Sequence, residues 1–129
     1  MTLHTAGYAE YRLYIGSVNM ATKEQFTKRE LVDAVARLQK EWEAARGYTH
    51  TVRVSECDYV CGDYEESGWE LSVINYPRRR HDLPLIEQFC VELQSRLMAE
   101  FRQHRITVMA DIPGSRIAFM AESEDAATK

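Results

Sequence analysis

One helix is defined in this sequence together with both of its ends, and no other segment constrains the fold as strongly. Thr27 and Glu30 form a Thr-x-x-Glu capping box, and Gly47 is the residue type expected where a helix stops. Between these ends, apolar residues recur at steps of three and four and share one face: Leu31, Val35, Leu38, Trp42 and Ala45. The pattern predicts an amphipathic helix over residues 28–46 whose apolar face must pack against another element.

Segments in which apolar and polar residues alternate lie on both sides of this helix. Such alternation is the period of a strand with one buried face. It predicts strands over residues 11–18, 48–59, 69–76 and 106–112, with residues 116–120 as either a short fifth strand or an extension of the fourth. The polar residues 61–68 include two glycines and predict a hairpin loop. A second helix is predicted after Asp82, with Pro84 in its first turn and an apolar face of Ile86, Phe89, Cys90, Leu93, Leu97 and Phe101.

The resulting order, β-α-β-β-α-β, predicts an α+β fold. We expect a ferredoxin-like sandwich in which two helices pack on one face of an antiparallel sheet. An open α+β sheet with another strand order is the alternative. The chain has 129 residues, which fits a single domain spanning 1–129. We expect an ordered core at about residues 10–120, with a loose N-terminus and a frayed acidic tail from Ala121 onward.

Charge and cysteine content narrow the class of protein. The net charge is −4, which disfavours a general nucleic-acid binder because such proteins usually carry a basic balance. No apolar run is long enough to span a membrane, and the first residues lack the pattern of a secretory signal. The three cysteines cannot all pair within one chain. We therefore expect a cytoplasmic protein with reduced thiols.

The most unusual local feature is a basic run immediately before the second helix. Arg78, Arg79, Arg80 and His81 stand where free backbone N–H groups and the helix dipole favour an anion. Guanidinium groups bind phosphate and carboxylate through two parallel hydrogen bonds. Arg12 and Arg53, on predicted strands, are candidates to extend this site. The alternative is a solvated loop whose charges keep an acidic protein in solution.

Other residue combinations are weaker signals. Cys57 and Cys61 with His50 resemble part of a zinc site, but the remaining ligand would have to come from His81 or His104. Structural roles for the cysteines are favoured, and no metal, cofactor or catalytic residue is predicted. The same residues could form a Cys–His pair, although any chain of this composition offers such combinations. The acidic residues near the hairpin are interpreted as solvated charges: Asp63, Glu65, Glu66 and Glu70.

Three short motifs resemble a known group of proteins. They are Tyr11-Arg12-Leu13-Tyr14-Ile15-Gly16, then Gly47-Tyr48-Thr49, then Asp111-Ile112-Pro113 with Arg116 and Phe119. Together they resemble small bacterial and phage ferredoxin-like proteins of unknown function, over residues 11–119. The resemblance implies the fold and carries no activity with it.

The sequence favours a non-enzymatic binding module. A two-layer sandwich leaves one sheet face uncovered, and a mixed polar and aromatic set is expected on it: Arg12, Tyr14, Thr49, Thr51, Arg53, Glu70, Ser72 and Ile74. Such a face suits a homo-oligomer interface. The expected partners are a second copy and either a small anionic ligand, such as a nucleotide, or a host protein that a phage-related module would inhibit. The alternative is a small enzyme with His50 or His81 as general base at a subunit interface.

Overall fold

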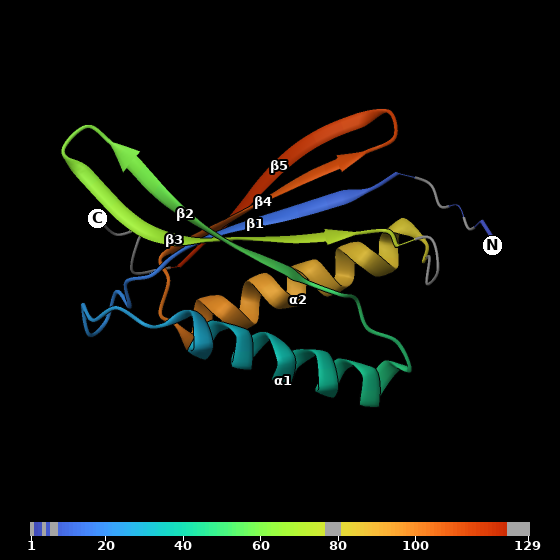
Figure 1. Ribbon diagram of the computed structural model, residues 1–129, viewed down its shortest axis with the longest axis horizontal. Coiled ribbons are helices and arrows are strands. Elements are labelled where there is room, and N and C mark those ends of the chain that lie inside the picture. Colours follow the sequence, from blue (N-terminus) through green and yellow to red (C-terminus); the bar gives the residue numbers. More distant parts are fainter. Residues whose placement is uncertain (1, 4, 6–7, 77–80, 124–129) are drawn as a thin grey trace.

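The computed structural model describes residues 2–3, 5, 8–76 and 81–123 (Figure 1). Five strands and two helices follow one another in the order β1 (Glu10–Gly16), α1 (Lys28–Arg46), β2 (Arg53–Cys61), β3 (Tyr64–Ile74), α2 (Leu83–Glu100), β4 (Arg105–Ile112) and β5 (Ser115–Glu122). The predicted alternation of strands and helices is therefore confirmed, with a fifth strand at the end.

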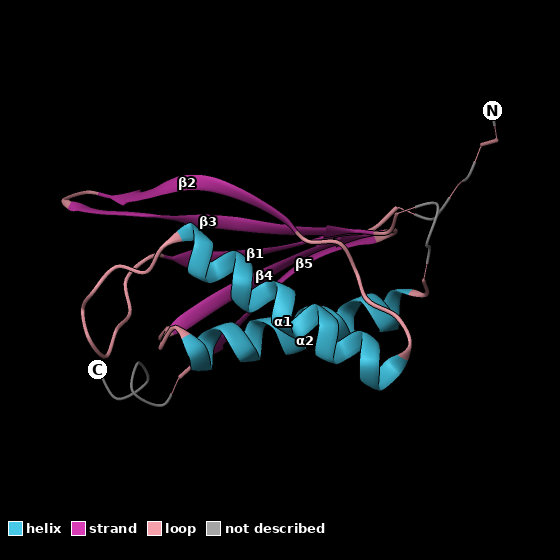
Figure 2. Cartoon of the chain, turned by 60° about the horizontal axis from the view of Figure 1, so that its bottom comes forward, coloured by secondary structure: helices cyan, strands magenta, loops and turns pink. Residues whose placement is uncertain are grey.

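The strands form one antiparallel sheet in the order β2-β3-β1-β4-β5. Both helices lie on the same face of this sheet, and the opposite face is open (Figures 1 and 2). The α+β class and the two-layer arrangement of the prediction are confirmed. Neither helix in the described part of the chain has the length and apolar character needed to cross a membrane.

The core lies between the sheet and the helices. Alternate residues of the central strand β1 point into it, and Tyr11, Leu13 and Ile15 are almost fully buried. They meet the apolar faces of α1 and α2 and the inward side chains of β3 and β4: Leu31, Leu38, Leu71, Val73, Phe89, Leu93, Ile106 and Val108. Burying one such side chain contributes about 1.5–3 kcal/mol. The two layers are therefore held together mainly by apolar contact.

Helix α1 has the bounds that its sequence signals predict. The Thr27 hydroxyl accepts a hydrogen bond from the Glu30 backbone N–H at 3.1 Å, and Glu30 Oε1 accepts one from the Thr27 backbone N–H at 3.3 Å. At the other end, Gly47 adopts a left-handed conformation with φ of 81°. Helix α2 begins after Asp82 as predicted, but the Asp82 side chain forms no capping hydrogen bond.

The two strands of the hairpin formed by β2 and β3 are longer than predicted, and the turn between them is shorter. Only Gly62 and Asp63 form the turn, and residues expected in a loop belong to the two strands. Figure 1 shows the hairpin extending beyond the ends of the helices. Its polar residues pair there without a layer to pack against, so they need not alternate with apolar ones. Gly62 supplies the positive φ of 62° that the turn requires.

Two other boundaries differ from the prediction. Strand β5 is a separate strand that pairs with β4 along its whole length, from Arg105↔Glu122 to Ile112↔Ser115, so it includes Ala121 and Glu122 of the expected tail. The second strand begins at Arg53 instead of Tyr48. Residues 48–52 therefore form an irregular connection that passes between α1 and the sheet edge, and this connection shapes the candidate site.

Candidate functional site

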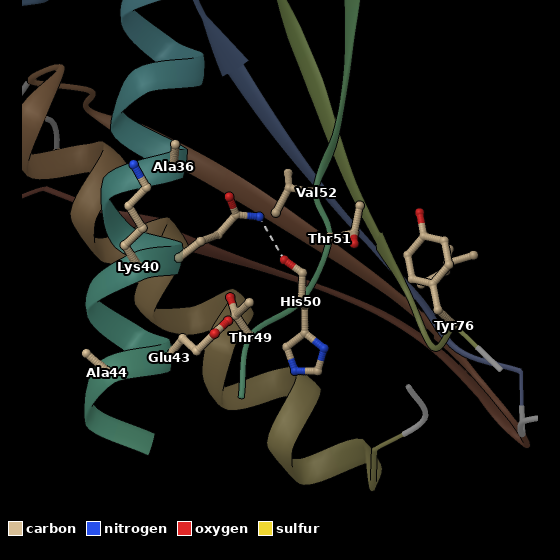
Figure 3. A pocket seen from close by; sticks show the side chains of 11 residues that line it. Ala36, Lys40, Glu43, Ala44, Thr49, His50, Thr51, Val52 and Tyr76 are labelled. Atoms are coloured by element: carbon tan, nitrogen blue, oxygen red, sulfur yellow. Dashed lines mark hydrogen bonds between the residues drawn. The ribbon is translucent and has the colours of Figure 1, made fainter. Parts of the chain in front are cut away.

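A cleft of about 1020 Å³ separates the outer face of α1 from the connection that leads into β2 (Figure 3). Ligand sites are commonly clefts of roughly 300–1,000 Å³. One wall comes from α1, and the other comes from the connection and the end of β3: Ala36, Gln39, Lys40, Glu43, Ala44, Thr49, His50, Thr51, Val52, Ile74 and Tyr76. Gln39 Nε2 donates a hydrogen bond to the His50 carbonyl oxygen at 2.8 Å and ties the two walls together.

The connection carries three consecutive residues with buried polar atoms that have no hydrogen-bond partner among the described residues. These atoms are Tyr48 Oη, Thr49 Oγ1 and His50 Nε2. Buried polar groups in folded proteins nearly always have a partner, in the protein or in water. Thr49 and His50 also line the cleft, so its wall contains polar groups that the rest of the described chain leaves unpaired.

His50 is the most deeply buried of the three, with 6% of its surface exposed. Its imidazole points away from the hydrogen bond with Gln39 (Figure 3) and contacts the rings of Tyr48, His81 and Phe89. Burial lowers the pKa of His50 to about 4, the nearby His81 adds to the shift, and a hydrogen bond with the Leu85 backbone opposes it. His50 is therefore an uncharged side chain at neutral pH.

His81 connects this cleft to a second, smaller hollow. Its ring centroid lies 4.9 Å from that of His50 and 5.0 Å from that of Tyr48. Its backbone N–H donates to Asn75 Oδ1 at 3.0 Å, which fixes the start of α2 against the end of β3. The hollow on its other side has a volume of about 500 Å³ and is lined by Tyr8, Asn75, His81, Asp82, Leu83, Leu85 and Pro113.

The structure places the predicted anion-site residues in different regions. Arg12 and Arg53 lie on the open face of the sheet, on either side of Ser72, with which both are in register. His81 lies against the cleft wall instead, and Arg78, Arg79 and Arg80 fall outside the described residues. The structure thus brings two arginines together and separates them from His81. A ligand role for these residues stays a prediction.

Arg12 already has anionic partners. Its Nη2 lies 2.6 Å from Glu10 Oε1, and its Nε lies 3.5 Å from Glu70 Oε1. The hydrogen bond with Arg12 lowers the pKa of Glu10, and burial partly opposes that shift. Because two carboxylate side chains already lie beside Arg12, its guanidinium is engaged within the protein before any ligand arrives.

The other candidate sites, which combine cysteine, histidine and acidic residues, are not assembled in the described part of the chain. Its His, Cys, Asp and Glu side chains include no group of three that could hold a metal ion. Cys57, Cys61 and Cys90 are all unbridged. Cys90 is fully buried in the core, where burial raises the pKa of its thiol and disfavours the reactive thiolate. Near the hairpin, Glu66 is held by the Val18 backbone N–H at 2.9 Å and by the Tyr64 hydroxyl.

Sequence reasoning missed most of the cleft. Thr49 and Thr51 were expected on the open sheet face, but they line the cleft because the strand begins only at Arg53. Lys40 and Glu43 carry no local signal, since charged residues are ordinary on the outer face of a helix. His50 was recognised as a candidate base, and its burial could not be inferred from its neighbours in sequence.

Comparison with known proteins yields structural matches only. No family model matches the chain, and no curated protein matches it. Two solved structures share its fold, and each match covers 96% of this chain and 96% of the other. One is a phage SAM lyase in its apo state, at 16% identity and a TM-score of 0.72. The other is a phage SAM lyase in complex with S-methyl-5′-thioadenosine, at 14% identity and a TM-score of 0.67.

These matches correct the functional expectation. Both of these solved structures are described as a lyase, which is an enzyme, so the expectation of a non-enzymatic binding module is wrong. The alternative, a small enzyme, fits better. The ligand in the second structure is a nucleoside thioether without net charge, in contrast to the anionic ligand predicted from the arginines. The resemblance to ferredoxin-like proteins of unknown function stays a prediction.

Proposed function

We propose that this chain is an enzyme that cleaves S-adenosylmethionine and releases S-methyl-5′-thioadenosine. One observation carries the proposal: the fold coincides over 96% of both chains with a phage SAM lyase, which in one structure holds S-methyl-5′-thioadenosine. The cleft beside α1 adds support, because its volume of about 1020 Å³ can accommodate a nucleoside and its lining includes the uncharged polar residues Thr49, His50 and Thr51.

The chemistry follows from the sulfonium group of the substrate. When the bond between the sulfur and Cγ of the methionyl arm breaks, the electron pair goes to the sulfur and a neutral thioether leaves. Without water, this bond can break in two ways. The carboxylate oxygen of the same arm can attack Cγ as the thioether leaves, which closes a lactone, or a base can remove a proton from Cβ as the thioether leaves, which gives an alkene.

The electrostatics of His50 favour the lactone. A base with a pKa of about 4 is a poor acceptor for a proton on carbon. Lactone closure needs no protein base, because the nucleophile is part of the substrate. The protein would contribute by folding the arm so that the carboxylate lies behind Cγ, and by excluding water that would compete. Uncharged His50 and the buried hydroxyls beside it suit that positioning role.

The test is to incubate purified protein with S-adenosylmethionine and follow the products by mass spectrometry. We expect many equivalents of S-methyl-5′-thioadenosine per protein molecule, together with a lactone that carries no label when the reaction is run briefly in ¹⁸O-water. S-Adenosylhomocysteine should survive, because its neutral thioether would have to leave as a thiolate. Cleavage no faster than in a protein-free control would contradict the proposal, and labelled homoserine as the first product would indicate hydrolysis instead.

We also propose that the chain forms a homo-oligomer through the open sheet face. Met109 and Met120 lie on this face of β4 and β5 and are 39% and 48% exposed. Large exposed apolar side chains on an unpacked face are typical of interfaces. Native mass spectrometry should show a multimer, which Met109→Glu should dissociate. A monomeric wild-type protein at micromolar concentration would contradict this.

We also propose that the sheet has a ferredoxin-like topology. The order β2-β3-β1-β4 places the strands that follow the two helices outside a central pair, as a ferredoxin-like sandwich requires. We propose that β5 is an edge strand added to that arrangement. A crystal structure with another order of the first four strands would contradict it.

A further inference from the structure

Two opposite charges on α1 face the cleft. Lys40 and Glu43 are three residues apart in the helix, so they lie on the same side of it, and both line the cleft. Figure 3 shows them on the α1 wall, across from Thr51 and Tyr76. The cleft therefore has a charged wall on α1 and an uncharged wall on the connection and β3.

These two side chains differ from the other charged residues of α1. In the described part of the chain, neither Lys40 nor Glu43 has an ion-pair or hydrogen-bond partner. The other charged side chains of the helix each have a partner in the protein. Five ion pairs and hydrogen bonds involve them: Lys28 with Glu56, Arg29 with Asp33, Arg37 with Glu100, Glu41 with Arg96, and Glu30 in the capping box. Arg46 forms neither, but its guanidinium stacks on the Trp42 ring. The two charges that face the cleft are the two left available for a ligand.

The wall opposite α1 carries polar and aromatic side chains without net charge. Thr49 Oγ1 and His50 Nε2 are buried without a partner among the described residues, and His50 is more than nine-tenths buried. Because burial keeps His50 uncharged at neutral pH, neither of these lining residues brings a net charge to this wall. The ring of Tyr76 stands at the end of the same wall and is 37% exposed, so one side of it can stack on a flat ring.

We infer that the cleft binds a nucleoside that carries a zwitterionic amino-acid arm, with Lys40 and Glu43 as the residues that recognise the arm. The Lys40 ammonium binds the α-carboxylate, and the Glu43 carboxylate binds the α-ammonium. The nucleoside lies against Thr49, His50 and Tyr76. This inference rests on the proposed function and assigns its specificity to particular residues. It also explains how an acidic protein holds the carboxylate that would close the lactone.

The experiment compares two ligands that differ only in the arm. S-Adenosylhomocysteine has the zwitterionic arm and is not expected to react, whereas S-methyl-5′-thioadenosine lacks it. Calorimetric titration of the wild-type protein should show tighter binding of S-adenosylhomocysteine. Lys40→Met and Glu43→Gln should each weaken that binding about tenfold, which corresponds to the loss of one charge-assisted hydrogen bond. Both variants should bind S-methyl-5′-thioadenosine within about twofold of the wild type.

Lys28→Met and Glu41→Gln are the matched controls, because they make the same changes on the same helix outside the cleft. Both should bind the two ligands as the wild type does. Unchanged binding of S-adenosylhomocysteine to the Lys40 and Glu43 variants would overturn the inference, and so would an equal loss of both ligands. If the wild type still cleaves S-adenosylmethionine in those cases, the proposed function stands. A wild-type protein that binds neither ligand and shows no cleavage would overturn both.

Discussion

His50 alone is expected to make the folded state about 3 kcal/mol less stable at pH 4 than at pH 7. Its pKa is about 4 in the folded protein and 6.5 in the reference state, and one pKa unit corresponds to about 1.4 kcal/mol. The folded pKa is depressed, so the unfolded chain binds the proton more readily. The stabilisation is therefore complete above pH 6.5 and is lost as the pH falls from 6.5 through 4.

The measurement is urea unfolding at several pH values between 7 and 4, for the wild type and for His50→Gln. Glutamine stays uncharged, so the variant should lose about 3 kcal/mol less of its stability over that range. Carboxylates that titrate in the same range act on both proteins and cancel in the difference. Parallel curves for the two proteins would show that His50 is not held uncharged by burial.

His81 provides a second test of the same physical cause. It lies 4.9 Å from His50, and its electrostatic effect adds to the lowering of the pKa of His50. Replacing it in His81→Gln should raise the pKa of His50 and shift the loss of stability to a higher pH. NMR titration of the His50 ring protons measures this directly, and a pKa unchanged by the substitution would leave burial as the sole cause.

Elements with local determinants could be predicted from the sequence. Helix α1 has the predicted bounds because its ends are fixed by contacts between near neighbours, such as Thr27 with Glu30. Alternation likewise identified β1, where every second residue is buried. Predictions failed where a strand extends beyond the helices that cover the rest of the sheet. In the hairpin, Glu65 and Glu66 continue the ladder beyond the helices, so the apolar signal of a strand is missing there.

The cleft could not be predicted for a related reason. Residues 48–52 have the Tyr, Thr and Val content of a strand, but the structure uses them as a connection held to α1 by the bond from Gln39 to His50. Their placement depends on a contact across 11 positions in the chain. The role proposed for Lys40 and Glu43 depends on the residues that lie opposite them across the cleft. The sequence indicates which residue types are present, and only the fold shows which charges face a cavity.

Gly68→Ala is expected to destabilise the protein by about 3 kcal/mol, because the added methyl group has no space. A Cβ at this position would overlap the Ile15 carbonyl oxygen and would lie 2.9 Å from Gly16 Cα, both in the backbone of the neighbouring strand β1. It would also lie 2.7 Å from Cε2 of Tyr59, whose hydroxyl is fixed by its hydrogen bond to the Trp69 carbonyl oxygen. Relief therefore requires β1 and β3 to separate, which disturbs the central pairing of the sheet.

Gly16→Ala is the matched control, since Gly16 faces Gly68 directly across the ladder. Its added methyl group would meet only the carboxylate of Glu66, the mobile end of a long side chain. Moving that carboxylate gives up its hydrogen bond from the Val18 backbone N–H, so the cost should be about 1 kcal/mol. Both substitutions remove the same chain entropy from the unfolded state, so their difference in urea unfolding isolates the steric effect. Equal losses in the two variants would mean that β1 and β3 can adjust at Gly68 without separating.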